Sequence, residues 1–136
     1  MPSWTPTLLT GHAAIDTHHQ EIFARMDALH AAMLRGERSE TSRLIEFLGQ
    51  YVLEHFSAEE AIMESAQYPF LEPHRREHRE FVRDYDRFRE EFDAHGPTAS
   101  LTLRANEWLQ RWLTTHVTGT DVTLALHLRK PPPMRR

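Results

Sequence analysis

Five histidines and two carboxylates recur along this chain in a pattern that could bind two metal ions. They fall in four separate runs of sequence, and each run lies on a stretch that we expect to be helical, or just beyond its end. The seven residues are His19, His55, Glu59, His74, His78, His116 and Asp121. Imidazole and carboxylate together suit non-haem iron, whereas thiolates suit zinc or an iron–sulfur cluster, and the chain has no cysteine. The residue types therefore predict a two-iron site inside a helical bundle.

Two of these runs place their candidate ligands four residues apart. On an α-helix such residues differ by about 40° around the axis, so their side chains point the same way. His55 and Glu59 form one such pair, and His74 and His78 form the other. Each pair is therefore expected to enter the site from one face of one helix.

The last run has a different spacing, because His116 and Asp121 are five residues apart. On a continuous α-helix these two side chains would diverge by roughly 140°. Gly119 lies between them, and glycine tolerates backbone conformations that other residues avoid. We expect the backbone to leave the helix at Gly119 and to swing Asp121 back toward the site.

Four amphipathic stretches, with apolar residues at helical three-and-four spacing, must position these side chains. The stretches run over residues 16–35, 39–66, 73–94 and 99–117. Each carries its ligands within or next to its own apolar stripe, and the short connections imply antiparallel neighbours. The predicted fold is all-α, an antiparallel up-down-up-down four-helix bundle. An N-terminal arm that contains Trp4 precedes it, and the residues around 121–128 are compatible with a short C-terminal helix.

These stripes would bury the seven polar side chains in one core. A buried polar group costs free energy unless a partner satisfies it. One histidine on an apolar face is usually a satisfied core residue, but here each of the four helices brings at least one. A pair of cations would satisfy the whole set, so a bundle without metal is disfavoured.

Length and composition are typical of one ordinary domain with a single core. The chain has 136 residues, of which 40% are hydrophobic and 26% are charged, and its formal net charge is −4. No long basic stripe is present, which argues against nucleic-acid binding. The N-terminal residues lack the basic start and apolar run of a secretory signal, and no stretch is long enough to insert across a membrane. We therefore expect a cytoplasmic protein.

The order and content of the ligand runs resemble the hemerythrin family, specifically its single-domain bacteriohemerythrins. The resemblance is carried by GHAAIDTHH, HFSAEE, HRREH and WLTTHVTGTD, in this order along the chain. In the first run, Asp16 and His19 match the family's D-x-x-H. The resemblance implies a hemerythrin-like domain over residues 1–128. A basic, proline-rich tail over 129–136 follows it and is expected to be disordered.

The resemblance implies a cofactor of two iron ions joined by an oxo or hydroxo bridge, where dioxygen binds reversibly. One iron would be held by three histidines and the other by two, with both carboxylates bridging the pair. The three histidines are His74, His78 and His116, the two are His19 and His55, and the bridging carboxylates are Glu59 and Asp121. This arrangement leaves one position open on the iron with two histidines, and dioxygen is expected there.

A pocket around that open position follows from the same resemblance. By alignment to the family's motifs, Ile22, Phe56, Trp112 and Val117 would line it. An apolar wall there would exclude water and suppress autoxidation of the iron. The same residues also fit plain core packing, and the two interpretations are compatible.

Several other polar residues are not expected to bind metal. The remaining histidines are His12, His18, His30, His95 and His127. His18 is turned about 100° from His19 on a helix, and we expect it at a boundary or exposed. Glu60 is turned from Glu59 by the same angle, which predicts a solvent environment. Asp16 is expected to cap the first helix. The alternative is that Asp16 orients a ligand histidine.

The favoured function is reversible dioxygen binding by a carrier, store or scavenger, which is not an enzyme. Weak diiron oxidase or peroxidase activity and nitric oxide handling are alternatives. The Glu-x-x-His ligation of ferritin-like diiron proteins is absent from the sequence, which argues against oxidase chemistry. An oxygen or redox sensor is a further alternative and would need a separate, unknown protein partner. No decisive apolar outer face is visible, so we expect a monomer.

Overall fold

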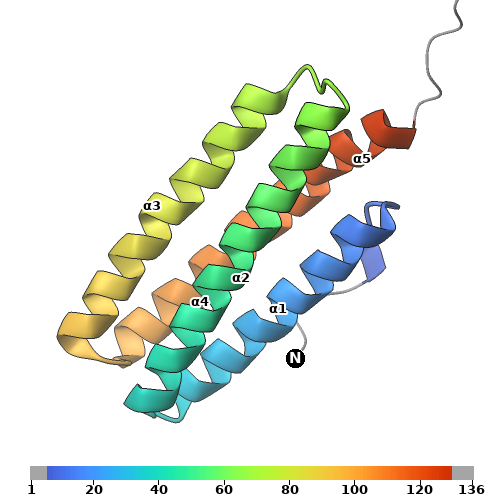
Figure 1. Cartoon of the computed structure of the whole chain (residues 1–136). Coiled ribbons are helices and arrows are strands. Elements are labelled where there is room, and N and C mark those ends of the chain that lie inside the picture. Colours follow the sequence, from blue (N-terminus) through green and yellow to red (C-terminus); the bar gives the residue numbers. More distant parts are fainter. Residues whose placement is uncertain (1–5, 130–136) are drawn as a thin grey trace, which may run out of the picture.

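The computed structural model describes residues 6–129, and every regular element in this range is helical. The elements are η1 (Pro6–Leu8), α1 (Ala13–Leu34), α2 (Arg38–Ser65), α3 (Leu71–His95), α4 (Ala99–Thr115), η2 (His116–Asp121) and α5 (Val122–Arg129). Helices α1 to α4 run alternately up and down the long axis of the molecule (Figure 1), and both α1 and α3 pack against α2 and α4. The predicted all-α, antiparallel four-helix bundle is confirmed.

The first helix begins earlier than its sequence pattern predicts, and its cap is a different residue. His12 is the N-cap of α1, where its Nδ1 atom accepts a hydrogen bond from the Ile15 backbone N–H at 3.3 Å. Asp16 lies in the first turn and is buried. Its carboxylate accepts hydrogen bonds from the Thr10 N–H and hydroxyl, both at 2.7 Å, and from the Gly11 N–H at 3.1 Å. Asp16 therefore fastens the preceding loop to the helix, and the expected capping role was wrong.

Two glycines allow the turns that make neighbouring helices antiparallel. Gly36 follows α1 with φ of 70°, and Gly96 follows α3 with φ of 72°. Side chains with a Cβ atom rarely adopt such angles, whereas glycine does so at little cost. Thr98 then caps α4, because its side chain accepts a hydrogen bond from the Leu101 N–H at 3.1 Å. The short connections bring the ends of successive helices together.

The core consists of two apolar clusters that lie on either side of a polar layer. The larger cluster takes residues from all four long helices and includes Phe23, Met26, Phe81, Phe92 and Leu109. The smaller one consists of Ile15, Met63, Tyr68 and Leu124. In α1, α2 and the α4–α5 segment, the candidate ligands fall in sequence between residues of the two clusters. The polar layer is therefore closed off from both ends of the bundle.

The last described part of the chain, residues 99–129, is one continuous helical rod, because α4 passes through η2 directly into α5. The expected short C-terminal helix over 121–128 is present as α5. Trp4 of the predicted arm lies outside the described residues. So does the predicted tail, apart from Arg129 at its start.

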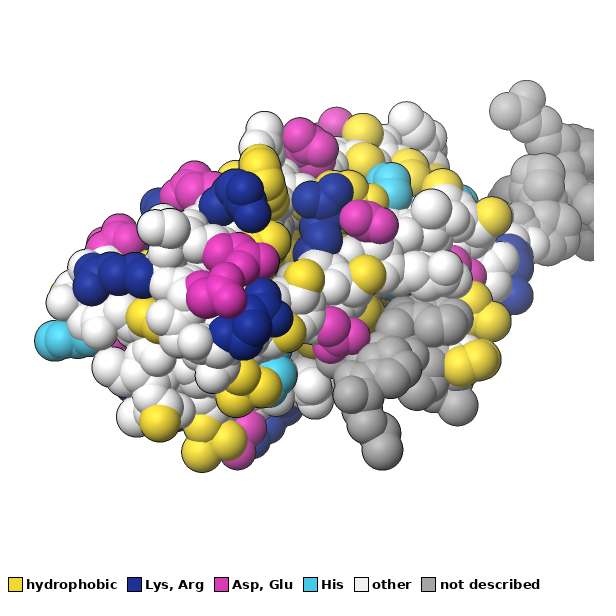
Figure 2. All heavy atoms as spheres, turned by 90° about the horizontal axis from the view of Figure 1, so that it is seen from below, with side chains coloured by type: hydrophobic (Ala, Val, Ile, Leu, Met, Phe, Trp, Pro, Cys, Tyr) yellow, Lys and Arg dark blue, Asp and Glu magenta, His cyan; other side chains and the backbone are white. Residues whose placement is uncertain are grey.

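The charged surface is mixed in sign. On the face shown in Figure 2, Arg side chains alternate with Asp and Glu and form no continuous basic stripe. Ion pairs account for part of this pattern, including Arg104 with Glu91 and Arg89 with Asp86. Within residues 6–129, none of the helices combines the length and apolar composition needed to cross a membrane.

Candidate metal centre

All seven predicted ligand residues lie together in the interior, between the two apolar clusters. Each of them is at most 3% exposed. They come from α1 (His19), α2 (His55 and Glu59), α3 (His74 and His78) and η2 (His116 and Asp121). Charged and polar residues reach such burial only when they are paired or bind metal. The arrangement is therefore a built site and not a chance cluster of core histidines.

A π-helical turn positions the last two residues. Six residues, His116–Asp121, form a π-helix between α4 and α5. In a π-helix each residue bonds to the fifth along the chain, so residues five apart lie on the same face. Gly119 keeps helical geometry with ordinary negative φ, unlike Gly11, Gly36 and Gly96. The expectation that the chain leaves the helix at Gly119 was wrong, because a wider helical turn aligns His116 with Asp121.

The carboxylate of Glu59 divides the histidines into two sets. Its Oε2 atom is 2.9 Å from the His55 Nε2 atom. Its Oε1 atom contacts the His74 Nε2 atom and is 3.3 Å from His78 Nε2 and 3.8 Å from His116 Nε2. One oxygen thus faces three histidines, and the other faces the remaining side of the centre.

Asp121 repeats this division with the same two sets. Its Oδ2 atom is 2.7 Å from the His19 Nε2 atom, and its Oδ1 atom is 3.2 Å from both His74 Nε2 and His116 Nε2. The atoms of His19, His55, Glu59 and Asp121 form one group with metal-binding spacing, and those of Glu59, His74, His78 and His116 form another. We call these the two-histidine half and the three-histidine half. Each carboxylate sends one oxygen to each half, as bridging ligands do.

The atoms that face one another in this centre make no hydrogen bonds. Among the described residues, the five Nε2 atoms and all four carboxylate oxygens of the centre are buried without a hydrogen-bond partner. Their close approaches lack the alignment that an N–H donor requires. So many unpartnered buried groups would be costly in a metal-free core. Nitrogen and oxygen donors without sulfur suit iron, so the residues fit two metal ions.

The buried histidines and carboxylates of the site shift one another's pKa values. Burial lowers the pKa of His74, but Asp121 and Glu59 outweigh burial and raise that pKa to about 9. Burial and the Glu59 charge raise the pKa of Asp121, but His116 and His19 outweigh them and lower it to about 2. The site therefore holds protons on imidazole where metal ions would bind.

A second row of polar residues contacts the outer nitrogens of three candidate ligand histidines. Glu60 Oε2 lies 3.1 Å from His78 Nδ1, and Glu77 Oε1 lies 3.1 Å from His116 Nδ1. The third contact joins His18 Nδ1 to His55 Nδ1 at 2.9 Å. Sequence reasoning missed all three and placed Glu60 in solvent. Each contact crosses to a neighbouring element, so spacing along one helix carries no signal for it.

The two carboxylates of the second row are themselves held in place. Glu60 Oε1 accepts a hydrogen bond from Arg75 Nε at 2.8 Å. Glu77 accepts hydrogen bonds from the Thr120 hydroxyl at 2.8 and 3.0 Å. The hydrogen bond from His116, together with that from Thr120, holds the pKa of the Glu77 carboxyl below its usual value. Both second-row carboxylates are thus fixed opposite their histidines.

Two of the four residues predicted to line a dioxygen pocket contact histidines of the centre. Ile22, Phe56 and Val117 are buried, and Trp112 is partly buried. The Phe56 ring stacks on His78, with centroids 3.8 Å apart and planes 6° apart. Trp112 stacks on His116 at 4.5 Å and 14°. These contacts place aromatic rings directly against two ligand histidines.

The other histidines lie apart from the two groups of ligand atoms. His12 caps α1, and His127 packs against the Tyr68 ring with centroids 5.0 Å apart. His95 is exposed at the end of α3. His18 contacts a ligand histidine and is the one residue of this set that belongs to the surroundings of the centre.

The sequence and fold match known proteins over most of the chain. The family model described as the hemerythrin HHE cation binding domain matches residues 10–125, which include all seven residues of the centre. A bacteriohemerythrin of Stenotrophomonas maltophilia (strain R551-3) is 34% identical over 122 residues, covering 90% of this chain and 78% of the relative. One of Pseudomonas paraeruginosa (strain DSM 24068 / PA7) is 35% identical over 118 residues, covering 87% and 75%. A crystal structure of wild-type hemerythrin superposes with a TM-score of 0.83 at 26% identity, covering 93% of this chain and 97% of that chain.

Proposed function

The chain belongs to the hemerythrin family of diiron-binding domains, and we propose that it binds dioxygen reversibly at a non-haem diiron centre. The observation that carries the proposal is the division of the buried donors into two halves that share both carboxylates. Two metal ions are the partners that such a donor set needs. The bacteriohemerythrins that resemble this chain support iron as the metal.

In this proposal each of the seven residues has a defined role as a ligand. His74, His78 and His116 would hold one iron, His19 and His55 would hold the other, and the two would share Glu59 and Asp121. Because the two-histidine half has one protein donor fewer, it would leave a position free for dioxygen. When bound, the diiron cofactor with its oxo or hydroxo bridge would supply the electrons for reversible dioxygen binding.

The apolar residues beside the centre keep water away from it. Trp112 stacks on His116 and also lines a surface cavity of about 360 Å³, together with Trp108 and Arg111. Phe56 covers His78 and contacts Trp112, with ring centroids 6.0 Å apart. We propose that these two rings, with Ile22 and Val117, form the dioxygen pocket. An apolar wall that excludes water would slow the proton-dependent oxidation of the iron, so that dioxygen is released unchanged.

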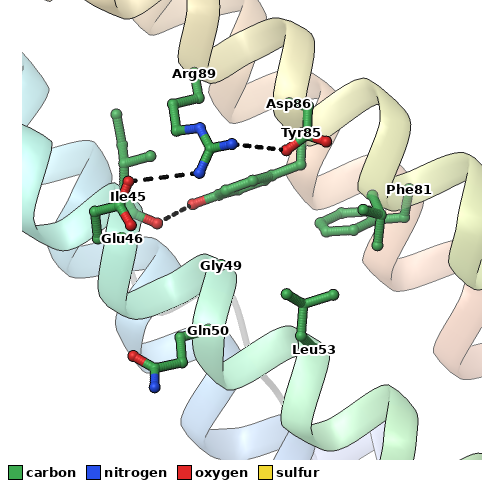
Figure 3. A pocket seen from close by; sticks show the side chains of 10 residues that line it. Ile45, Glu46, Gly49, Gln50, Leu53, Phe81, Tyr85, Asp86 and Arg89 are labelled. Carbon is green, nitrogen blue, oxygen red and sulfur yellow. Dashed lines mark hydrogen bonds and ion pairs between the residues drawn. The ribbon is translucent and has the colours of Figure 1, made fainter.

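The protein acts as a binding protein and not as an enzyme. A cavity of about 270 Å³ lies between α2 and α3 (Figure 3), where Ile45, Gly49, Phe81 and Tyr85 contribute to its lining. None of the seven ligand residues lines it. A substrate bound in this cavity would not reach the iron, whereas dioxygen is small enough to enter the packed apolar side of the centre.

Visible absorption of the iron-loaded protein tests this function. The sample is reduced without air, opened to air and then purged with inert gas. The expected result is a colourless reduced form that gains charge-transfer bands in air and loses them on purging. Direct passage to a ferric spectrum that purging does not reverse would overturn the proposal and would favour an oxidase or a redox sensor.

A further inference from the structure

The two halves of the metal centre differ in what supports their histidines from outside. In the three-histidine half, His78 faces the carboxylate of Glu60 and His116 faces that of Glu77, each at 3.1 Å. In the two-histidine half, His55 faces only another imidazole, that of His18, at 2.9 Å. Among the described residues, the Nδ1 atoms of His19 and His74 are both buried without a hydrogen-bond partner, so each half has one unsupported histidine. The halves differ because outer carboxylates face two histidines of the three-histidine half and none of the two-histidine half.

This difference has a direct chemical consequence for metal binding. The Nε2 atoms face the centre, so a metal-bound histidine carries its remaining proton on Nδ1. An Nδ1–H that donates to a carboxylate fixes the ring orientation and makes Nε2 a stronger donor. A neutral acceptor such as the His18 imidazole also fixes the orientation of the facing ring, but it raises the basicity of that ring's Nε2 atom much less.

The support is rigid on the three-histidine side. Arg75 holds Glu60 through a hydrogen bond of 2.8 Å, and Thr120 holds Glu77 from within the π-helix itself. Glu77 thus joins α3 to the turn that carries both His116 and Asp121. A carboxylate that is already ordered loses little freedom when the metal binds.

We propose that Glu60 and Glu77 are positioning residues that make the three-histidine half the tighter metal subsite, so that the two halves fill in order. The three-histidine half fills first, and the two-histidine half fills second and empties first. The proposal rests on the diiron centre of the proposed function but not on dioxygen binding.

A titration of the metal-free chain with Co²⁺ under inert gas tests this order. Co²⁺ reports its ligands through visible absorption and through hyperfine-shifted proton signals of the bound imidazoles. The wild-type chain is expected to bind in two resolved steps. After the first step, three exchangeable Nδ1–H signals are expected, which correspond to His74, His78 and His116. Two signals at that stage, or both ions bound in one unresolved step, would overturn the proposed order.

The variants Glu60→Gln and Glu77→Gln separate the role of the negative charge from that of shape. Glutamine retains the size and an acceptor oxygen but not the charge, so each variant should weaken the first step by about 10- to 100-fold. The second step should change far less, and the exchangeable signal of the facing histidine should shift. Equal weakening of both steps, or an unchanged first step, would refute the assigned role.

Two matched variants complete the experiment. Glu80→Gln removes one negative charge from the exposed surface of α3, three residues after Glu77, and should leave both steps unchanged. A first step as weak in Glu80→Gln as in Glu77→Gln would attribute the effect to net charge alone and refute the proposal. His18→Gln should weaken the second step and spare the first. Dioxygen binding by the iron form is measured in a separate experiment. If the iron form does not bind dioxygen, the Co²⁺ titration still decides the filling order.

Discussion

Asp121 follows His116 by one π-helical turn, and its Oδ1 atom lies 3.2 Å from the His116 Nε2 atom. The helix widens here by one residue instead of breaking. The wider turn lets a single rod of α4, η2 and α5 present two donors to the same centre. Single π-turns inside α-helices are frequent at functional sites for this reason.

Deleting Gly119 should preserve the centre, because the five-residue spacing then becomes four, which an ordinary α-helix aligns. Inserting one alanine after Gly119 should remove Asp121 from the centre, because a six-residue spacing matches neither helix. The number of metal ions bound per chain, measured by elemental analysis, distinguishes the two. Equal loss of metal in both variants would contradict this account of the π-turn.

His74→Ala should lose or greatly weaken metal binding, because His74 contacts both of the carboxylates that we propose as bridging ligands. Removing it also takes one close imidazole away from each of those buried carboxylates. His95→Ala is the matched control, since His95 is exposed at the end of the same helix. Iron content per chain is the measurement, and full diiron content in His74→Ala would refute its role as a ligand.

Trp112→Ala should keep both iron ions but autoxidise faster, because water from the neighbouring surface cavity would reach His116. Trp108→Ala is the control. Trp108 lines the same cavity but stacks on Phe81, with centroids 5.4 Å apart, and not on a ligand histidine. The rate of appearance of the ferric spectrum in air is followed for both. Identical rates in wild type and Trp112→Ala would count against the proposed wall.

Gly49→Ala should destabilise the bundle by about 1–3 kcal/mol through overpacking. A Cβ atom at Gly49 would lie 2.9 Å from Cε1 of Tyr85, whose hydroxyl donates to the Ile45 carbonyl at 2.7 Å (Figure 3). Gly119→Ala is the comparison, since its Cβ meets nothing within 4 Å, and it should be neutral or stabilising by about 0.5–1 kcal/mol. Urea unfolding measures both, and equal effects would contradict the prediction.

The stability of the metal-free chain should fall at alkaline pH. The pKa of His74 is raised from 6.5 to about 9, so its contribution is complete below pH 6.5 and is lost as the pH rises through about 9. The pKa of Asp121 is lowered from 3.8 to about 2, so its contribution is present above pH 3.8 and is lost as the pH falls through about 2. Between pH 3.8 and 6.5 both contributions are present.

Urea unfolding at about pH 6 and about pH 9.5, with and without Zn²⁺, measures this dependence. Bound metal replaces the protons on the ligands, so the alkaline loss should disappear in the metal-bound form, and metal affinity should rise with pH up to about pH 9. His74→Gln should flatten the alkaline slope of the metal-free chain. A metal-free wild type equally stable at both pH values would show that His74 does not hold its proton in the folded state.

Local spacing along the chain determined the helices and the inward-facing pairs. Residues four apart share a face of an α-helix in any context, so His55 with Glu59 and His74 with His78 followed from the sequence. The apolar stripes and short loops implied the antiparallel bundle for the same reason. The seven candidate ligands were predicted because polar side chains within apolar stripes need a partner.

Only the tertiary structure decided how the centre is completed. The π-turn at His116–Asp121 replaces the predicted break at Gly119, because Asp121 must align with donors from other helices. Glu60 and Glu77 face ligand histidines across element boundaries, and no spacing within one helix reports such contacts. The Asp16 carboxylate accepts hydrogen bonds from Thr10 and Gly11, which precede α1, so it fastens this loop and does not cap the helix. The periodicity of the sequence indicates which face of its own helix a side chain occupies. Which residue that side chain contacts depends on how the neighbouring helices pack.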